Sequence, residues 1–129
     1  MPQATNLTIK NAANADKTFE LITPAAGDGG IAEWALKEGV ISSVFPRLTA
    51  SAHKTPRGRV LTTKLRLPSS YQDAVTGLTN VGSAAEVNIK VSMPADYPEA
   101  KKDDFVAFTR NSIAHALFQS MMRDATSAN

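Results

Sequence analysis

The 129-residue sequence contains no cysteine, which excludes disulfides and thiolate metal sites. It has no apolar run of about 18 residues, the minimum for a transmembrane helix. Its N-terminus lacks the charged and apolar regions of a signal peptide. We therefore expect a protein that is made in the cytoplasm and has no membrane association. A chain of this length is expected to fold as a single domain, 1–129, with its own core.

Signals of catalysis are also scarce. The chain has only two histidines, and no zinc-protease, nucleophile-elbow, Walker or EF-hand pattern is present. The Gly27–Gly30 run does not lead from a strand into a helix, as a phosphate-binding loop does. Asp103 and Asp104 follow two lysines, which is typical of an exposed charged turn. We expect no enzymatic activity, no cofactor, no metal and no small-molecule substrate.

Acidic residues are missing from one long stretch of the chain. Between Gly39 and Gln72 there is no Asp or Glu, although the whole chain has 12 acidic residues and a net charge of +2. The same stretch contains six cations, which are Arg47, Lys54, Arg57, Arg59, Lys64 and Arg66. This local excess of positive charge favours a polyanionic partner, while a merely solvated strand face would give the same composition.

The acid-free stretch also has the period-two pattern of β-strands. Residues 47–55 and 59–67 alternate between apolar and polar, and Pro56-Arg57-Gly58 between them is typical of a three-residue hairpin loop. One face of this hairpin is mostly apolar. The other carries cations and hydroxyls without an acid, namely Arg47, Thr49, Ser51, His53, Thr55, Thr62, Lys64 and Arg66. We expect this polar face to bind phosphate.

The remaining pattern predicts strands followed by helices, which is an α+β fold with an antiparallel sheet and C-terminal helices on one face. We expect an N-terminal hairpin and loop over 1–30, a main sheet over 31–94 and a helical tail over 95–129. The segment 31–37 fits either a strand or a helical turn. The tail is apolar on more than one side, so it predicts a partner subunit that covers the additional apolar surface. His115 is expected to lie within the helix of this tail.

Two prolines are expected to limit the strands of the sheet. Pro68 should end the second strand of the hairpin because proline has no N–H to donate. Residues 69–83, rich in small polar side chains, are expected to form a long mobile loop. Residues 84–93 alternate again and predict the last strand, which Pro94 ends.

Four segments together resemble the coat proteins of the single-stranded RNA bacteriophages, the levivirus group. They are Gly30–Trp34, Leu48–Ser51, Thr62–Leu65 ahead of Pro68, and Asn88 five residues after Ser83. The resemblance implies an N-terminal hairpin, a five-stranded sheet and C-terminal helices in an interlocked homodimer. It also implies a capsid, usually of T=3 symmetry, whose inward sheet face binds single-stranded genomic RNA and an RNA stem-loop. The implied location is the virion, after synthesis in the bacterial host cytoplasm.

The resemblance further implies which residues contact RNA, because lysine and arginine contact phosphates while hydroxyls and amides reach unpaired bases. Thr49, Ser51, Thr62 and Lys64 resemble the contacting strand residues, with Arg47, His53, Thr55 and Asn88 at further contacting positions and Ile31 at an apolar position beside a base pocket. Two residues depart from the pattern of some relatives: Glu86 replaces an aromatic residue, and Arg66 replaces an acid.

The resemblance also assigns a role to residues 72–83. They match the segment that changes conformation between five-fold and quasi-six-fold positions of the shell. Here the segment lacks proline, so Gly77 and Gly82 are expected to supply its flexibility.

The sequence leaves two other interpretations open. The first is a small dimeric RNA-binding regulator that never forms a shell, but such proteins usually present aromatic stacking platforms, which the polar face lacks. The second is a structural β protein that binds nothing, for which the acid-free basic hairpin would be accidental.

Overall fold

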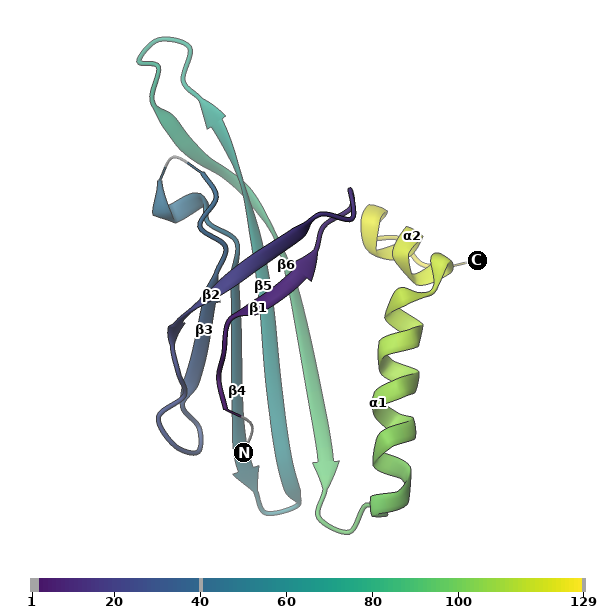
Figure 1. The fold of residues 1–129 in the computed structure, drawn as a ribbon. Coiled ribbons are helices and arrows are strands. Elements are labelled where there is room, and N and C mark those ends of the chain that lie inside the picture. The colour runs from purple at the N-terminus through teal and green to yellow at the C-terminus, as the bar shows by residue number, and fades with distance from the viewer. Residues whose placement is uncertain (1–2, 40, 129) are drawn as a thin grey trace. The chain divides into compact units, whose positions relative to one another are not determined.

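The computed structural model describes residues 3–39 and 41–128. The chain divides into two compact units, Met1–Pro94 and Ala95–Asn129, the first built of strands and the second of helices (Figure 1). The elements of the first unit, in chain order, are β1 (Leu7–Lys10), β2 (Asp16–Thr23), β3 (Ile31–Ala35), a short 3-10 helix (Ser42–Val44), β4 (Arg47–Thr55), β5 (Gly58–Gln72) and β6 (Thr79–Pro94). The second unit contains α1 (Glu99–Ala114) and α2 (Ala116–Asp124).

The strands form one antiparallel sheet in which spatial order follows chain order, β1-β2-β3-β4-β5-β6. Strand β2 pairs with β1 in the N-terminal hairpin and also with β3, so β2 to β6 make a five-stranded sheet that shares a strand with the hairpin. This confirms the predicted α+β class. The segment 31–37, which fitted either a strand or a helical turn, forms β3.

The predicted central hairpin is confirmed as β4 and β5, with a shorter turn than expected. Thr55 pairs with Gly58, so the loop contains two residues, Pro56 and Arg57, and the predicted three-residue loop is wrong by one. Gly58 has a φ of +152°, in the range that favours glycine. The Thr55 hydroxyl donates to the Gly58 carbonyl over 3.1 Å, which ties the two strand ends together.

Strand β5 does not end at Pro68, contrary to the prediction. It continues to Gln72, which pairs with Thr79 of β6, so the expected loop over 69–83 shrinks to residues 73–78. The register shifts between Pro68 and Ser70. A proline is tolerated at such an irregularity because the ladder there does not require its missing N–H. Figure 1 shows β5 and β6 running side by side up to this loop.

The loop at the end of β5 and β6 is organised by Asp73. Its carboxylate accepts hydrogen bonds from the backbone N–H groups of Val75 at 2.7 Å and Thr76 at 3.2 Å, which hold the pKa of Asp73 below its usual value. Its own N–H donates to the Leu78 carbonyl, and Gly77 donates to the Asp73 carbonyl, both over 2.8 Å. Gly77, with a φ of +71°, supplies the left-handed corner that this turn requires.

Gly82 lies inside β6 and outside the loop. A Cβ atom at this position would stand 2.7 Å from the hydroxyl of Ser69, which itself donates to the Ser83 carbonyl over 2.5 Å. Glycine therefore allows the two strands to approach closely beside the register shift, a role different from the flexibility expected of it.

Few side chains are buried in the described part of the chain. The core of the strand unit is a cluster of Phe19, Ala32 and Trp34, and the indole N–H of Trp34 donates to the Thr5 carbonyl over 2.7 Å. Ala35 and Val44 are the other buried hydrophobic residues. Many larger apolar side chains of the sheet remain more than a third exposed, among them Leu61, Leu65, Leu67, Val87 and Ile89. So small a core leaves much of the apolar surface of the single chain exposed.

The helical unit is interrupted at His115, which the sequence placed within a helix. His115 has an extended backbone (φ −69°, ψ 140°) and both ends α1 and caps α2, its Nδ1 accepting from the N–H of Leu117 over 3.2 Å. Pro98 immediately precedes α1 as its N-cap. Neither helix contains a buried residue.

Candidate nucleic-acid interface

One face of the sheet gathers polar side chains from neighbouring strands. Side chains alternate along each strand, and the register places every second residue of β3, β4, β5 and β6 on the same side. We call this side the cationic face; it comprises Ile31, Glu33, Arg47, Thr49, Ser51, His53, Thr55, Val60, Thr62, Lys64, Arg66, Glu86, Asn88, Lys90 and Ser92. The opposite side carries the partly exposed leucines and valines.

Two cross-strand rows lie at the centre of the cationic face. In the first row Thr49, Lys64 and Asn88 are directly paired across β4, β5 and β6. In the second row Ser51, Thr62 and Lys90 are paired in the same way. Side chains directly opposite each other on one face lie about 5 Å apart at Cβ, so each row places a lysine on the same side of the sheet as residues with hydroxyl or amide groups.

A pocket opens on this face around the first row. It has a volume of about 190 Å³ and is lined by Arg47, Thr49, Lys64, Leu65, Arg66, Glu86 and Asn88. Pockets for drug-sized ligands are usually about 300–1,000 Å³. The size therefore suits a small group such as a phosphate or one base, and the lining offers both hydrogen-bond donors and acceptors.

Carboxylates from the flanking strands reach the cationic face. Glu33 of β3 pairs with Arg47 at 2.5 Å, and the same guanidinium donates to the Ser42 carbonyl at 3.5 Å. Glu86 of β6 pairs with Arg66 at 3.5 Å. The β4–β5 hairpin has no acid of its own, as predicted, but its neighbours neutralise both arginines of this face.

The structure brings all nine residues of the predicted site onto this face. Ile31 lies opposite Ser51 at the β3 edge of the group and is exposed. The Ser51 hydroxyl donates to the Gly29 carbonyl at 3.4 Å. The nine residues are Ile31, Arg47, Thr49, Ser51, His53, Thr55, Thr62, Lys64 and Asn88.

Lys90 is a further functional candidate on this face, outside the nine residues predicted from the sequence. Its pairing with Thr62 puts it in the second row, one strand away from Ser51. Among the ion pairs of the described residues, none involves Lys90 or Lys64. The alternation of residues 84–93 placed Lys90 on the side of Asn88, and that signal could have identified it.

Two cations of the acid-free stretch lie on the opposite side of the sheet. Arg59 pairs with Asp28 at 2.5 Å, and the same carboxylate accepts from the backbone N–H of Lys54 at 3.0 Å. These two hydrogen bonds, the Lys54 one first, lower the pKa of Asp28. Lys54 and Arg59 alternate with the cationic-face residues, so they do not add to its charge.

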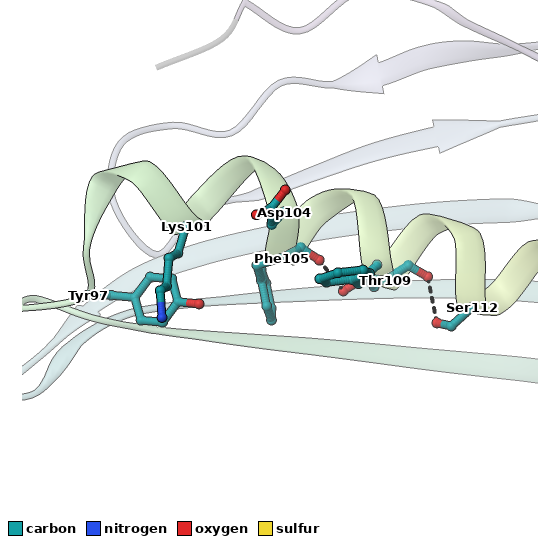
Figure 2. Close-up of a pocket in the computed structure, with 7 residues that line it drawn as sticks. Tyr97, Lys101, Asp104, Phe105, Thr109 and Ser112 are labelled. Atoms are coloured by element: carbon teal, nitrogen blue, oxygen red, sulfur yellow. Dashed lines mark hydrogen bonds between the residues drawn. The ribbon is translucent and has the colours of Figure 1, made fainter.

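A second hollow lies on the helical unit. Figure 2 shows it along α1, with the ring of Phe105 projecting from the helix and the ring of Tyr97 from the segment just before it. The hollow measures about 590 Å³ and is lined by Tyr97, Lys101, Asp104, Phe105, Phe108, Thr109 and Ser112. The hydroxyls of Thr109 and Ser112 donate to helix carbonyls at 2.8 and 2.9 Å, so they are already satisfied. Three of the seven lining residues are aromatic, so this surface suits an apolar partner better than RNA.

Within residues 3–39 and 41–128, no group of three or more His, Asp or Glu side chains is arranged to hold a metal ion. None of the helices in that part of the chain is long and apolar enough to cross a membrane.

Known proteins identify the class to which this fold belongs. The family model described as levivirus coat protein matches residues 2–128, so the chain belongs to the levivirus coat protein family. It is a capsid protein. No curated protein matches the sequence.

Solved structures have the same fold at low sequence identity. The virus-like particle of bacteriophage NT-214 matches with a TM-score of 0.85 at 20% identity, over 99% of this chain and 100% of the other. The virus-like particle of Beihai levi-like virus 21 gives a TM-score of 0.83 at 19% identity, over 99% of both chains. The capsid protein of bacteriophage GA gives 0.67 at 17% identity, over 95% of both chains.

Proposed function

We propose that this coat protein encloses single-stranded genomic RNA in a closed icosahedral shell and that its cationic face contacts that RNA. The observation that carries the proposal is the row in which Lys64 is paired with Thr49 on one side and Asn88 on the other. A cation flanked by neutral hydrogen-bonding groups is what recognition of unpaired nucleotides requires, since phosphate contacts position the RNA and base contacts specify it.

Each part of the face has a role in this proposal. Lys64 and Lys90 attract phosphates, and Ile31 packs against a base. The hydroxyl and amide groups of Thr49, Ser51, Thr62 and Asn88 hydrogen-bond to base edges. Arg47, His53 and Thr55 flank these contacts. An RNA stem-loop with unpaired bases is a suitable specific ligand, because such bases present their edges to side chains.

The shell is proposed to be built from interlocked homodimers. Strand β6 is an edge strand of 16 residues, and a long edge strand readily pairs with another copy. Two five-stranded sheets joined at β6 would give a ten-stranded sheet. The exposed apolar side chains of α1 and α2, including Val106, Phe108, Leu117 and Phe118, would be covered when each helical unit packs on the other subunit.

The loop of residues 73–78 is proposed to join neighbouring dimers around the symmetry axes of a shell, for which the family suggests T=3. Val75 at its tip is 94% exposed, and Leu78 is also exposed. Apolar side chains on an ordered loop tip suit contact with other copies. The proposed site of synthesis is the host cytoplasm, and the proposed final location is the virion. A structural role of this kind needs no catalysis.

Electron microscopy of the protein, expressed alone in bacteria and purified, tests the proposal. We expect uniform closed particles that contain host RNA protected from ribonuclease. A dispersed dimer without particles, across several salt and RNA conditions, would contradict the shell and would support the dimeric regulator.

A further inference from the structure

Four charged side chains form a continuous row across the cationic face. From β3 to β6 the order is Glu33, Arg47, Arg66, Glu86, which we call the charge row. Arg47 and Arg66 are directly opposite each other in the register, and Arg66 is directly opposite Glu86. Glu33 reaches Arg47 diagonally at 2.5 Å, and Glu86 reaches Arg66 at 3.5 Å.

The two carboxylates of the charge row offset the repulsion between its two arginines. Two like charges directly opposite on neighbouring strands repel each other, so the arginine pair is unfavourable by itself. A carboxylate at each end offsets this repulsion and leaves the row with no net charge. A phosphate that approaches either arginine must therefore compete with a carboxylate that is already paired with it. Lys64 in the next row and Lys90 in the row after it have no such competitor among the described ion pairs.

We propose that Glu33 and Glu86 limit the affinity of the cationic face for RNA by holding Arg47 and Arg66 in ion pairs. The inference rests on the proposed RNA-binding function and deepens it. The limit acts on attraction to the phosphate backbone, which does not depend on sequence. When attraction to the backbone is limited, the hydroxyl and amide contacts to bases contribute a larger share of the binding free energy. The two carboxylates therefore act as specificity-determining residues.

The proposed effect of the two carboxylates can be tested with substitutions that do not unfold the protein. Arg66 and Glu86 are 51% and 62% exposed, and exposed ion pairs contribute little to stability. The variants are Glu33→Gln and Glu86→Gln in the full-length protein. The matched control is Glu99→Gln, which removes one carboxylate from the Glu99–Lys102 pair in the helical unit and changes net charge equally. The probes are labelled oligouridylate and oligoadenylate, titrated over a range of salt concentrations.

Each row variant should bind both probes roughly two- to five-fold more tightly than the control variant near physiological salt. The slope of log K against log salt should become steeper by about 0.7 for each arginine released. Affinity equal to that of the control, or weaker than the unmodified protein, would overturn the inference. If the row variants give that result while Lys64→Ala still weakens RNA binding, only the inference fails. If the protein binds no RNA at all, the proposed function fails as well.

Discussion

Replacing Phe108 with serine should abolish the dimer and the particles built from it. Phe108 lies on α1 and is 75% exposed in the single chain, so its replacement would change the stability of an isolated subunit by no more than about 0.5 kcal/mol. In the proposed dimer the same ring packs against the second copy. Central aromatic side chains of interfaces contribute about 2 kcal/mol or more each, and the dimer contains two of them.

Size-exclusion chromatography with light scattering, together with thermal unfolding, measures this effect. The control is Arg110→Ser on the same helix, which lies two residues along and thus nearly on the other side of α1. The control should keep the dimer and its unfolding temperature. Dimers and particles of Phe108→Ser that match the control would exclude α1 from the subunit interface.

Replacing Lys64 with alanine should weaken RNA binding several-fold and flatten its salt dependence. Lys64 is the central cation of the first row and has a hydroxyl and an amide as its neighbours. Each cation that neutralises a phosphate releases counterions, so its loss should lower the slope of log K against log salt by about 0.7 to 1. The double variant Lys64→Ala, Lys90→Ala should lower the slope by about twice as much.

Lys54→Ala is the matched control for this prediction. It removes the same charge from the same hairpin, but Lys54 belongs to the opposite side of the sheet. Binding is measured by fluorescence anisotropy of a labelled oligouridylate. If the two single variants bind RNA equally well, net charge and not the cationic face determines the affinity.

The sequence was enough to predict which side chains share a face of the sheet, because side chains in a regular strand alternate between the two faces with a period of two residues. The polar side chains at 47–55 and 59–67 could face only one way once the hairpin formed, and the structure has them there. The same rule could have identified Lys90, which was not among the residues predicted for the site. The predicted RNA contacts of these residues are a separate matter and stay predictions.

The ion pairs of the charge row could not be predicted in this way. Glu33 and Glu86 are far from the hairpin in sequence, and only the pairing of β3 with β4 and of β5 with β6 brings them to Arg47 and Arg66. A segment of the sequence without acidic residues can thus lie on a surface to which neighbouring strands contribute acidic residues.

Two element boundaries were also missed, for local reasons. Pro68 looked like a strand end, but the register shift beside it removes the need for its N–H. The break between α1 and α2 has neither glycine nor proline to indicate it, since the His115 ring supplies the cap.

Ultraviolet crosslinking of RNA inside purified particles, followed by mass spectrometry of the crosslinked peptides, shows which surface of the protein contacts RNA. We expect crosslinks in the peptides of β4, β5 and β6 that carry Thr49, Lys64 and Lys90. Crosslinks confined to α1, α2 or the β1–β2 hairpin would contradict it, because RNA would then lie against a surface other than the cationic face.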